Sequence, residues 1–367
     1  MRITGIRVWQ MLLPLAEGSY QWAGGKSVEV FDSTLLAVDT DEGVTGWGEV
    51  CPLGPVYLPA YAEGVRGGIR ELGPHLLGLD PREHAALWRV MDGQLKGHPF
   101  VKSGLDMAAW DLLGKAAGLP VATLLGGIAT PDIPLYRAIS QRPADEMAAN
   151  LRAHRDDGYR RFQLKVGGDP DEDIRRIRAC RAILEPSDRL VADANTGWLP
   201  ADAMRVVNAV RDLDVFIEQP CLTYEESLSV RERTTLPFVL DENIDGLEPL
   251  LRAARDRAMD MVNIKLSKLG GLTQARLVRD LCARLGMLMI VEDSWGGDVA
   301  TAAIAHAAAS TPARHLFAAT DFNGYVTRSF ADGAPRRRGD TMRLPDGPGL
   351  GVAPRLDELG PPLFTIA

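Results

Sequence analysis

The sequence has few of the residues that cross-link a chain or anchor it in a membrane. Its 367 residues include only four cysteines, which lie far apart and form no CxxC pair. This pattern argues against a disulfide framework or a zinc site and is typical of buried thiols in a reducing compartment. No stretch approaches the roughly 18 consecutive apolar residues that a membrane-spanning helix needs. The N-terminal apolar run is short and has no small-residue cleavage site, so we expect a first β-strand instead of a signal peptide, in a cytoplasmic protein.

A basic surface and a dinucleotide-binding motif are also missing. The 41 Lys and Arg residues are outnumbered by 49 Asp and Glu residues, which gives a net charge of −8, and the two signs are interspersed. This distribution argues against a nucleic-acid partner. No G-x-G-x-x-G motif follows a predicted strand, which argues against a dinucleotide fold. The six histidines are scattered and form no H-x-H or H-E-x-x-H motif.

The composition, 46% hydrophobic and 25% charged, is that of a globular protein, and the length suggests two domains. We expect residues 1–128 to form an α+β domain, with a hairpin of strands 28–39 and 44–50 and a helix over 103–117. Residues 129–322 are expected to form a barrel, and residues 323–367 to pack back on the first domain.

The barrel prediction comes from short apolar strands that alternate with amphipathic helices. Eight strands are predicted, at residues 133–138, 161–166, 190–194, 215–219, 238–242, 261–266, 288–292 and 315–320. Alternation of this kind favours a parallel (β/α) barrel over a doubly wound sheet.

Charged residues stand at the carboxyl ends of these strands, where a barrel enzyme has its active site. In chain order they are Lys165, Asp193, Glu218, Asp241 with Glu242, Lys265, and Glu292 with Asp293. A buried charge is costly unless it is paired or bound to a metal. A single charge of this kind would suggest a structural ion pair, but one on each of six successive strands indicates a functional site.

The types of these residues indicate the chemistry. Asp193, Glu218 and Asp241 offer hard oxygen ligands, which suit Mg²⁺ or Mn²⁺ better than Zn²⁺. Lys165 and Lys265 come from the second and sixth of eight strands and therefore from opposite sides of the ring. A metal ion between two candidate bases suits removal of the weakly acidic proton next to a carboxylate, because the cation stabilises the enediolate as it forms.

The sequence resembles the enolase superfamily, specifically its muconate-lactonizing-enzyme subgroup. In the first domain the resemblance rests on the segments GVTGWGE at 43–49, LDMAAWDLLGK at 105–115 and GLPVATLLGG at 118–127. In the barrel it rests on DAN at 193–195, EQP at 218–220, DE at 241–242 and KLSKLGG at 265–271. The fold that it implies is a modified TIM barrel, (β/α)7β, with an α+β capping domain completed by the C-terminal segment.

The resemblance also implies roles for individual residues. Asp193, Glu218 and Asp241 would bind one Mg²⁺ per subunit, with Mn²⁺ as an alternative, and Lys165 and Lys265 would form the acid/base pair. Asn195 and Glu242 would lie next to this group. Gln163 departs from the K-x-K pattern that is usual on the second strand, and we expect its amide to contact the substrate instead. The resemblance further suggests a homo-oligomer.

Several segments look like those of the branch that acts on proline derivatives. They are CPLGPVY at 51–57, GH at 97–98, Q-L-K at 163–165 and EDSWGGD at 292–298. Members of this branch dehydrate cis-3-hydroxy-L-proline or epimerise 4-hydroxyproline betaine or proline betaine. Tyr57, Gln163, Asp293, Trp295 and Asp321 are therefore the predicted substrate-binding residues.

Within this branch we favour dehydration of cis-3-hydroxy-L-proline, because an acid such as Asp321 would suit a protonated amine. An aromatic box would instead suit a quaternary ammonium and a 2-epimerase. Outside it, a Schiff-base aldolase that uses one of the lysines and a catalytically inactive scaffold remain alternatives.

Overall fold

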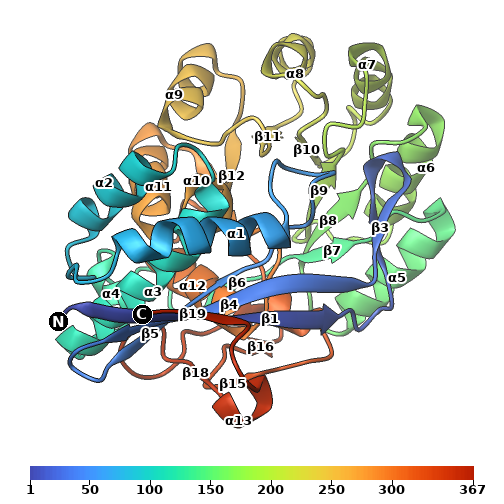
Figure 1. The fold of residues 1–367 in the computed structure, drawn as a ribbon. Coiled ribbons are helices and arrows are strands. Elements are labelled where there is room, and N and C mark those ends of the chain that lie inside the picture. The colour runs from blue at the N-terminus through green and yellow to red at the C-terminus, as the bar shows by residue number, and fades with distance from the viewer.

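The capping domain is built on an antiparallel sheet. The computed structural model describes residues 1–367. The sheet has the strand order β19-β1-β4-β5, formed by Phe364–Ile366, Ile3–Pro14, Val30–Thr40 and Thr45–Val50. Residues Asp41–Val44 connect β4 to β5, which confirms the predicted hairpin. The last strand, β19, lies beside β1, so the two ends of the chain meet in this domain (Figure 1).

Helices and a small hairpin complete the capping domain. The helices are α1 (Ala62–Leu72), α2 (His84–Gln94), α3 (Pro99–Ala117) and α4 (Val121–Leu124), with 3-10 turns η1 (Ala23–Gly25) and η2 (Gly73–His75). Strands β2 (Tyr20–Trp22) and β3 (Lys26–Val28) pair with each other. Helix α3 begins with a proline and is followed by Gly118, whose φ of 67° provides a left-handed C-cap.

The second unit is an eight-stranded parallel sheet that closes on itself. Its strands are β7 (Arg137–Ile139), β8 (Arg161–Lys165), β9 (Arg189–Asp193), β10 (Phe216–Glu218), β11 (Phe238–Leu240), β12 (Met261–Lys265), β13 (Leu288–Glu292) and β14 (Leu316–Ala319). A parallel bridge between Leu135 and Ala319 joins the two edges of the sheet. The predicted barrel with an α+β capping domain is therefore confirmed.

Helices connect successive strands of the barrel and surround it (Figure 1). They are α5 (Ala144–Asp156), α6 (Pro170–Arg181), α7 (Pro200–Ala209), α8 (Tyr224–Arg231), α9 (Leu247–Asp256), α10 (Leu266–Leu269), α11 (Leu272–Leu285) and α12 (Asp298–Ala309). Asp169 caps α6, and Thr223 with Glu226 forms a capping box at the start of α8. No helix in the structure has the length and apolar character needed to span a membrane.

Several predicted strands are shorter than expected, and the structure shows the reason for two of them. The strand predicted at residues 133–138 is divided into β6 (Ile133–Pro134) and β7, because β6 pairs with β17 (Thr341–Met342) of the C-terminal segment. The strand predicted at 238–242 ends at Leu240, because the backbone turns at Asp241, where the carbonyl accepts from the N–H of Ile244 at 2.9 Å.

The rest of the C-terminal segment consists of short elements. They are η3 (Phe322–Gly324), β15 (Ala331–Asp332), β16 (Arg337–Arg338), β18 (Ala353–Pro354) and α13 (Leu356–Leu359).

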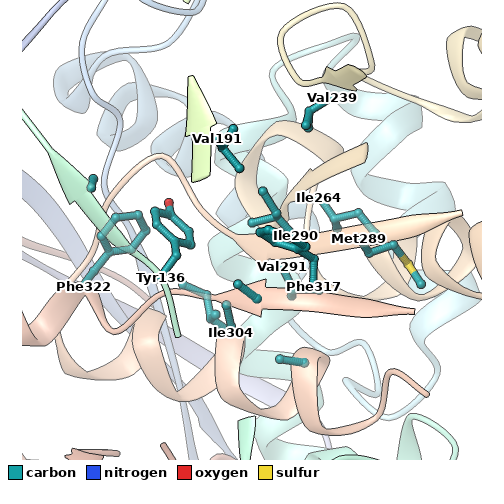
Figure 2. Close-up of a cluster of buried hydrophobic side chains, with 14 of the residues drawn as sticks. Tyr136, Val191, Val239, Ile264, Met289, Ile290, Val291, Ile304, Phe317 and Phe322 are labelled. Atoms are coloured by element: carbon teal, nitrogen blue, oxygen red, sulfur yellow. The ribbon is translucent and has the colours of Figure 1, made fainter. Parts of the chain in front are cut away.

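The main hydrophobic core fills the barrel and continues under the capping sheet. Strand residues such as Val191, Val239 and Ile264 belong to the same buried cluster as Ile304 of α12 (Figure 2). A smaller core of 19 residues lies between the capping sheet and helices α1 to α3. The first core keeps water from the barrel interior, so the polar groups at its mouth must bind one another or a ligand.

A buried histidine on α12 predicts acid sensitivity. The Nδ1 atom of His306 accepts from the N–H of Ala122 at 3.0 Å, and Nε2 lies 3.1 Å from the carbonyl of Leu350. Burial lowers the pKa of this histidine from 6.5 to about 4. Stability from the neutral ring is therefore complete above pH 6.5 and is lost as the pH falls toward 4.

We expect His306→Asn to lower the free energy of unfolding at pH 7.5. At pH 5 the wild type loses about 2 kcal/mol of its own stability, because the histidine is protonated in the unfolded chain but not in the folded protein. The difference in stability between the two proteins is therefore smaller at pH 5 by that amount. Urea unfolding of both proteins at the two pH values measures this difference. A difference that does not change with pH would contradict the assignment of the neutral ring.

Candidate active site

The charged residues at the strand ends meet at one level of the barrel. In the strand register Lys165 lies beside Asp193, Asp193 beside Glu218, and Lys265 beside Glu292. Asp241 follows directly after β11. All six of these strands run parallel to one another, so the side chains at their ends gather at the carboxyl face of the barrel.

Each of the two predicted catalytic lysines is paired with a carboxylate. Lys165 Nζ donates to Asp193 Oδ2 at 2.5 Å. Lys265 Nζ donates to Asp241 Oδ2 and lies 3.4 Å from Glu292 Oε1. Strands β8 and β12 are four positions apart in the eight-stranded order. Both lysines line the same cavity and enter it from opposite sides of the barrel.

Burial and neighbouring charge act against each other on these lysines. Burial by itself lowers the pKa of Lys165, but the negative charges of Asp193 and other neighbours leave that pKa well above its usual value. The pKa of Lys265 is raised in the same way, chiefly by Asp241 against the effect of burial. The neighbouring carboxylates therefore favour the ammonium form of both lysines.

Glu218 lies between the other two predicted metal ligands and is fully buried. Its two oxygens accept from Gln163 Nε2 and Asn263 Nδ2, each at 2.8 Å. Burial, followed by the charges of Asp193 and Asp241, raises the pKa of Glu218 well above its usual value. The three carboxylates are thus close enough to repel one another.

The charge of this region suits a divalent cation. The region contains five buried carboxyl groups, those of Asp193, Glu218, Asp241, Glu292 and Asp293, and three buried lysine side chains, those of Lys165, Lys265 and Lys268. The carboxyl groups outnumber the ammonium groups by two, and hard oxygen donors of this kind fit Mg²⁺. No three carboxylates converge on one point here, because Asp193 and Asp241 are turned toward lysines.

The two residues predicted to lie next to the carboxylates contact each other. Asn195 Nδ2 donates to Glu242 Oε1 at 3.1 Å, and the Asn195 backbone N–H donates to Asp193 Oδ1 at 2.8 Å. Burial, together with the charges of Asp241 and Asp193, raises the pKa of Glu242 to about 7. Asn195 Oδ1 and Glu242 Oε2 have no hydrogen-bond partner. These unpaired oxygens add further donor atoms beside the carboxylates.

Four of the five predicted substrate-binding residues line the cavity between the lysines, namely Tyr57, Gln163, Asp293 and Trp295. The hydroxyl of Tyr57 donates to Asp241 Oδ2 at 2.8 Å and accepts from Lys265 Nζ. Asp293 accepts from the hydroxyl of Ser267 at 2.8 Å, and burial raises its pKa to about 7.

Asp321 is not part of this cavity. Its carboxylate lies 3.3 Å from the hydroxyl of Tyr159 and lines a separate hollow together with Arg137 and Arg337. The structure therefore does not place Asp321 where it could bind the amine of a substrate between the lysines. It follows β14 in the chain, but its side chain turns toward Tyr159, which precedes β8.

Several residues of the site are not among those predicted from the sequence. Lys268 donates to Asp241 Oδ1 at 2.7 Å, and Asn263 bridges Glu218 and Glu292, each at 2.8 Å. Lys268 follows Lys265 by three residues in the KLSK segment, which was a usable signal. Asn263 carried no such signal, because a single asparagine in an apolar strand is usually a core residue whose side-chain hydrogen bonds are made within the protein.

Comparisons with known proteins agree with this arrangement. Residues 24–126 match the mandelate racemase/muconate lactonizing enzyme N-terminal domain, and residues 146–358 match the enolase C-terminal domain-like family. The chain is 57% identical over 363 residues, 99% of each chain, to cis-3-hydroxy-L-proline dehydratase of Roseibium aggregatum. It is 27% identical to N-succinyl-L-Arg/Lys racemase of Bacillus cereus, over 98% of this chain and 97% of that one.

A solved structure gives the same fold. An enolase superfamily member from Roseovarius nubinhibens, solved in complex with magnesium, is 43% identical and superposes with a TM-score of 0.93. The match covers 100% of this chain and 99% of that one.

Proposed function

Because the chain belongs to the mandelate racemase/muconate lactonizing enzyme family of the enolase superfamily, we propose that it catalyses magnesium-dependent dehydration of cis-3-hydroxy-L-proline. The products are Δ1-pyrroline-2-carboxylate and water. The observation that carries this proposal is the placement of Lys165 and Lys265 on opposite sides of one cavity. The 57% identity to the Roseibium dehydratase supports the choice of substrate.

The stereochemistry of this substrate requires two groups on opposite faces of the ring. In cis-3-hydroxy-L-proline the hydroxyl lies on the same face as the carboxylate, so the C2 hydrogen lies on the other face. One lysine removes the C2 proton, and the C–H electrons pass into the carboxylate to give the enediolate. These electrons then form the C2–C3 double bond while the second lysine protonates the departing hydroxyl, the C3–O bond breaks, and water leaves. The resulting enamine then tautomerises to the cyclic imine.

The metal centre in this proposal consists of Asp193, Glu218 and Asp241. Magnesium held by them would supply the positive charge that stabilises the enediolate and favours the neutral form of the lysine that serves as base. The hydrogen bond between Asn195 and Glu242 would help to hold the neighbouring Asp193 and Asp241 in place. The excess of buried carboxyl groups over ammonium groups is the structural support for a cation at this position.

Residues around the lysines would hold the rest of the substrate. We assign Tyr57, Gln163, Asp293 and Trp295 to substrate binding because all four line the cavity. Gln163 already uses one N–H of its side-chain amide on Glu218, so its carbonyl oxygen and its second N–H are left for the substrate.

The aromatic wall of the cavity favours one alternative, a 2-epimerase of 4-hydroxyproline betaine or proline betaine. The wall consists of Tyr20, Trp22, Tyr57, Tyr136, Trp295 and Phe322. Aromatic faces attract quaternary ammonium groups. The same two lysines would then remove the C2 proton from one face and return a proton to the other.

Incubation with Mg²⁺ in deuterated water, followed by NMR, separates these functions. We expect cis-3-hydroxy-L-proline to lose water at least about 100-fold faster than the trans isomer, because the trans isomer presents its hydroxyl and its C2 hydrogen on one face. Inversion of a betaine with no loss of water from hydroxyproline would establish the epimerase instead. A covalent adduct trapped by borohydride, with activity insensitive to EDTA, would establish the Schiff-base aldolase.

A further inference from the structure

Glu49, at the carboxyl end of β5 in the capping domain, forms a helix cap across to the barrel. Its side chain is fully buried. Oε1 accepts from the N–H of Gly297 at 2.7 Å, and Oε2 accepts from the N–H groups of Val299 and Ala300 at 3.1 and 2.9 Å. Ser33 of β4 donates its hydroxyl to Oε1 at 2.8 Å. The first N–H groups of α12, which have no partner within their own helix, are thus bound by a carboxylate from the other domain.

The capped helix directly follows a segment of the active site. Between β13 and α12 the chain passes through Asp293, Ser294 and Trp295, all of which line the cavity. Gly296 and Gly297 then lead into the helix. There is no space for a side chain at Gly297, because a Cβ atom there would lie 3.0 Å from Glu49 Oε1 and 2.5 Å from the ring of Phe330. The position of α12 therefore determines the position of this segment, which we term the 293–297 loop.

The same face of the capping sheet also holds the middle of the loop. The ring of Phe31, two residues before Ser33 on β4, stacks on the indole of Trp295 with 4.1 Å between ring centres and 16° between planes. Phe322 stacks on the same indole at 4.8 Å. Alternate residues of one strand thus fix both the indole and the carboxylate that caps the helix.

The loop presents two hydrogen-bond donors that no protein group accepts. The hydroxyl of Ser294 and the indole nitrogen of Trp295 are buried without a partner, although the two residues are only 6% and 2% exposed. Unpaired buried donors are costly, and a bound ligand that accepts from them removes that cost.

We propose that Glu49 is a positioning residue, which sets the 293–297 loop so that Ser294 and Trp295 can donate to the substrate. This proposal rests on the proposed function for the identity of that substrate. Glu49 does not line the cavity and acts only through the start of α12. The capping domain therefore shapes the barrel's binding site through a buried hydrogen-bond network as well as through the Tyr57 side chain.

The test compares Glu49→Gln with the control Glu232→Gln, an exposed glutamate that ends α8. Glutamine has the shape of glutamate but offers one acceptor oxygen in place of two, so part of the α12 cap is lost. We expect kcat/KM for cis-3-hydroxy-L-proline to fall about 10- to 100-fold, mainly through a higher KM. Hydrogen exchange of the backbone amides at 297–300 should become faster, while the affinity for Mg²⁺ stays within about twofold. The control should match wild type.

Action through the loop is tested by combining Glu49→Gln with Trp295→Phe, which keeps an aromatic ring but removes the donor. We expect the two effects on kcat/KM to be less than additive, whereas a general loss of structure would give independent effects. If Glu49→Gln does not fold, Ser33→Ala decides, because it removes the hydroxyl that holds Glu49 Oε1 toward Gly297 and so loosens the helix cap while both acceptor oxygens remain. Its kcat/KM should then fall about threefold or more, and wild-type kcat/KM in this variant would contradict the proposal.

Two outcomes overturn the proposal. One is wild-type kcat/KM in the Glu49→Gln protein, and the other is full additivity with Trp295→Phe. Failure of the proposed function is a different result, because wild-type protein would then leave cis-3-hydroxy-L-proline unchanged. In that case the substrate that wild type does convert is used for the same comparison.

Discussion

Replacement of Lys165 or Lys265 by alanine is expected to lower kcat by about 10⁴-fold, the upper end of what one acid or base contributes. Each lysine is the one ammonium group that enters the cavity from its side of the barrel, so no neighbour can substitute for it. Lys268 is turned away, with its Nζ bound to the carboxylate and the backbone carbonyl of Asp241. Steady-state assays with cis-3-hydroxy-L-proline and Mg²⁺ measure the loss.

The two variants should differ in a partial reaction. In the protein that keeps the base, the C2 proton of the substrate still exchanges with deuterated solvent, although water is not lost. In the protein that lacks the base, both exchange and dehydration stop. Magnesium affinity should survive in both, because each substitution removes a positive charge and leaves every carboxylate in place. The exposed Lys96, replaced by alanine, is the matched control. Near-native turnover in either variant would disprove the acid/base assignment.

Glu218→Gln is expected to weaken Mg²⁺ binding at least about 100-fold and to remove activity at millimolar Mg²⁺. Glu218 is flanked by Asp193 on the neighbouring strand and by Asp241 after the next one. Glutamine keeps the size of the side chain but removes one of the negative charges that attract the cation. Calorimetric titration with Mg²⁺ measures the affinity, and EDTA treatment of wild type followed by added Mg²⁺ or Mn²⁺ shows which cation restores activity.

The same substitution should have the opposite effect on metal-free stability. Burial and two neighbouring carboxylates raise the pKa of Glu218 well above its usual value, so the ionised group is unfavourable without a cation. We therefore expect metal-free Glu218→Gln to unfold at a temperature equal to or above that of metal-free wild type. Glu225→Gln, on the exposed side of α8, controls for the loss of charge. Unchanged Mg²⁺ affinity in Glu218→Gln would rule out this carboxylate as a ligand.

The strand ends show how much of the site could be predicted from sequence. Lys165, Asp193, Glu218 and Lys265 each end a strand, and the register places neighbouring ones side by side, because parallel strands separated by one helix end at the same face. Asp321 shows the limit. It also follows a strand, but its side chain lies outside the cavity. The backbone conformation just after the strand sets the direction of this side chain, and the sequence pattern does not show that conformation.

The sequence by itself determined the alternation of strands and helices, the barrel, and the chemical types of the residues at its mouth. These features depend on local periodicity, which a single chain displays directly. Only the tertiary structure decided which distant residues meet. Tyr57 reaches Lys265 across 208 positions, and Glu49 binds the start of α12 across 250. Such contacts depend on how two domains pack, and no local pattern records the pairing of an isolated glutamate with the free N–H groups of a helix in the other domain.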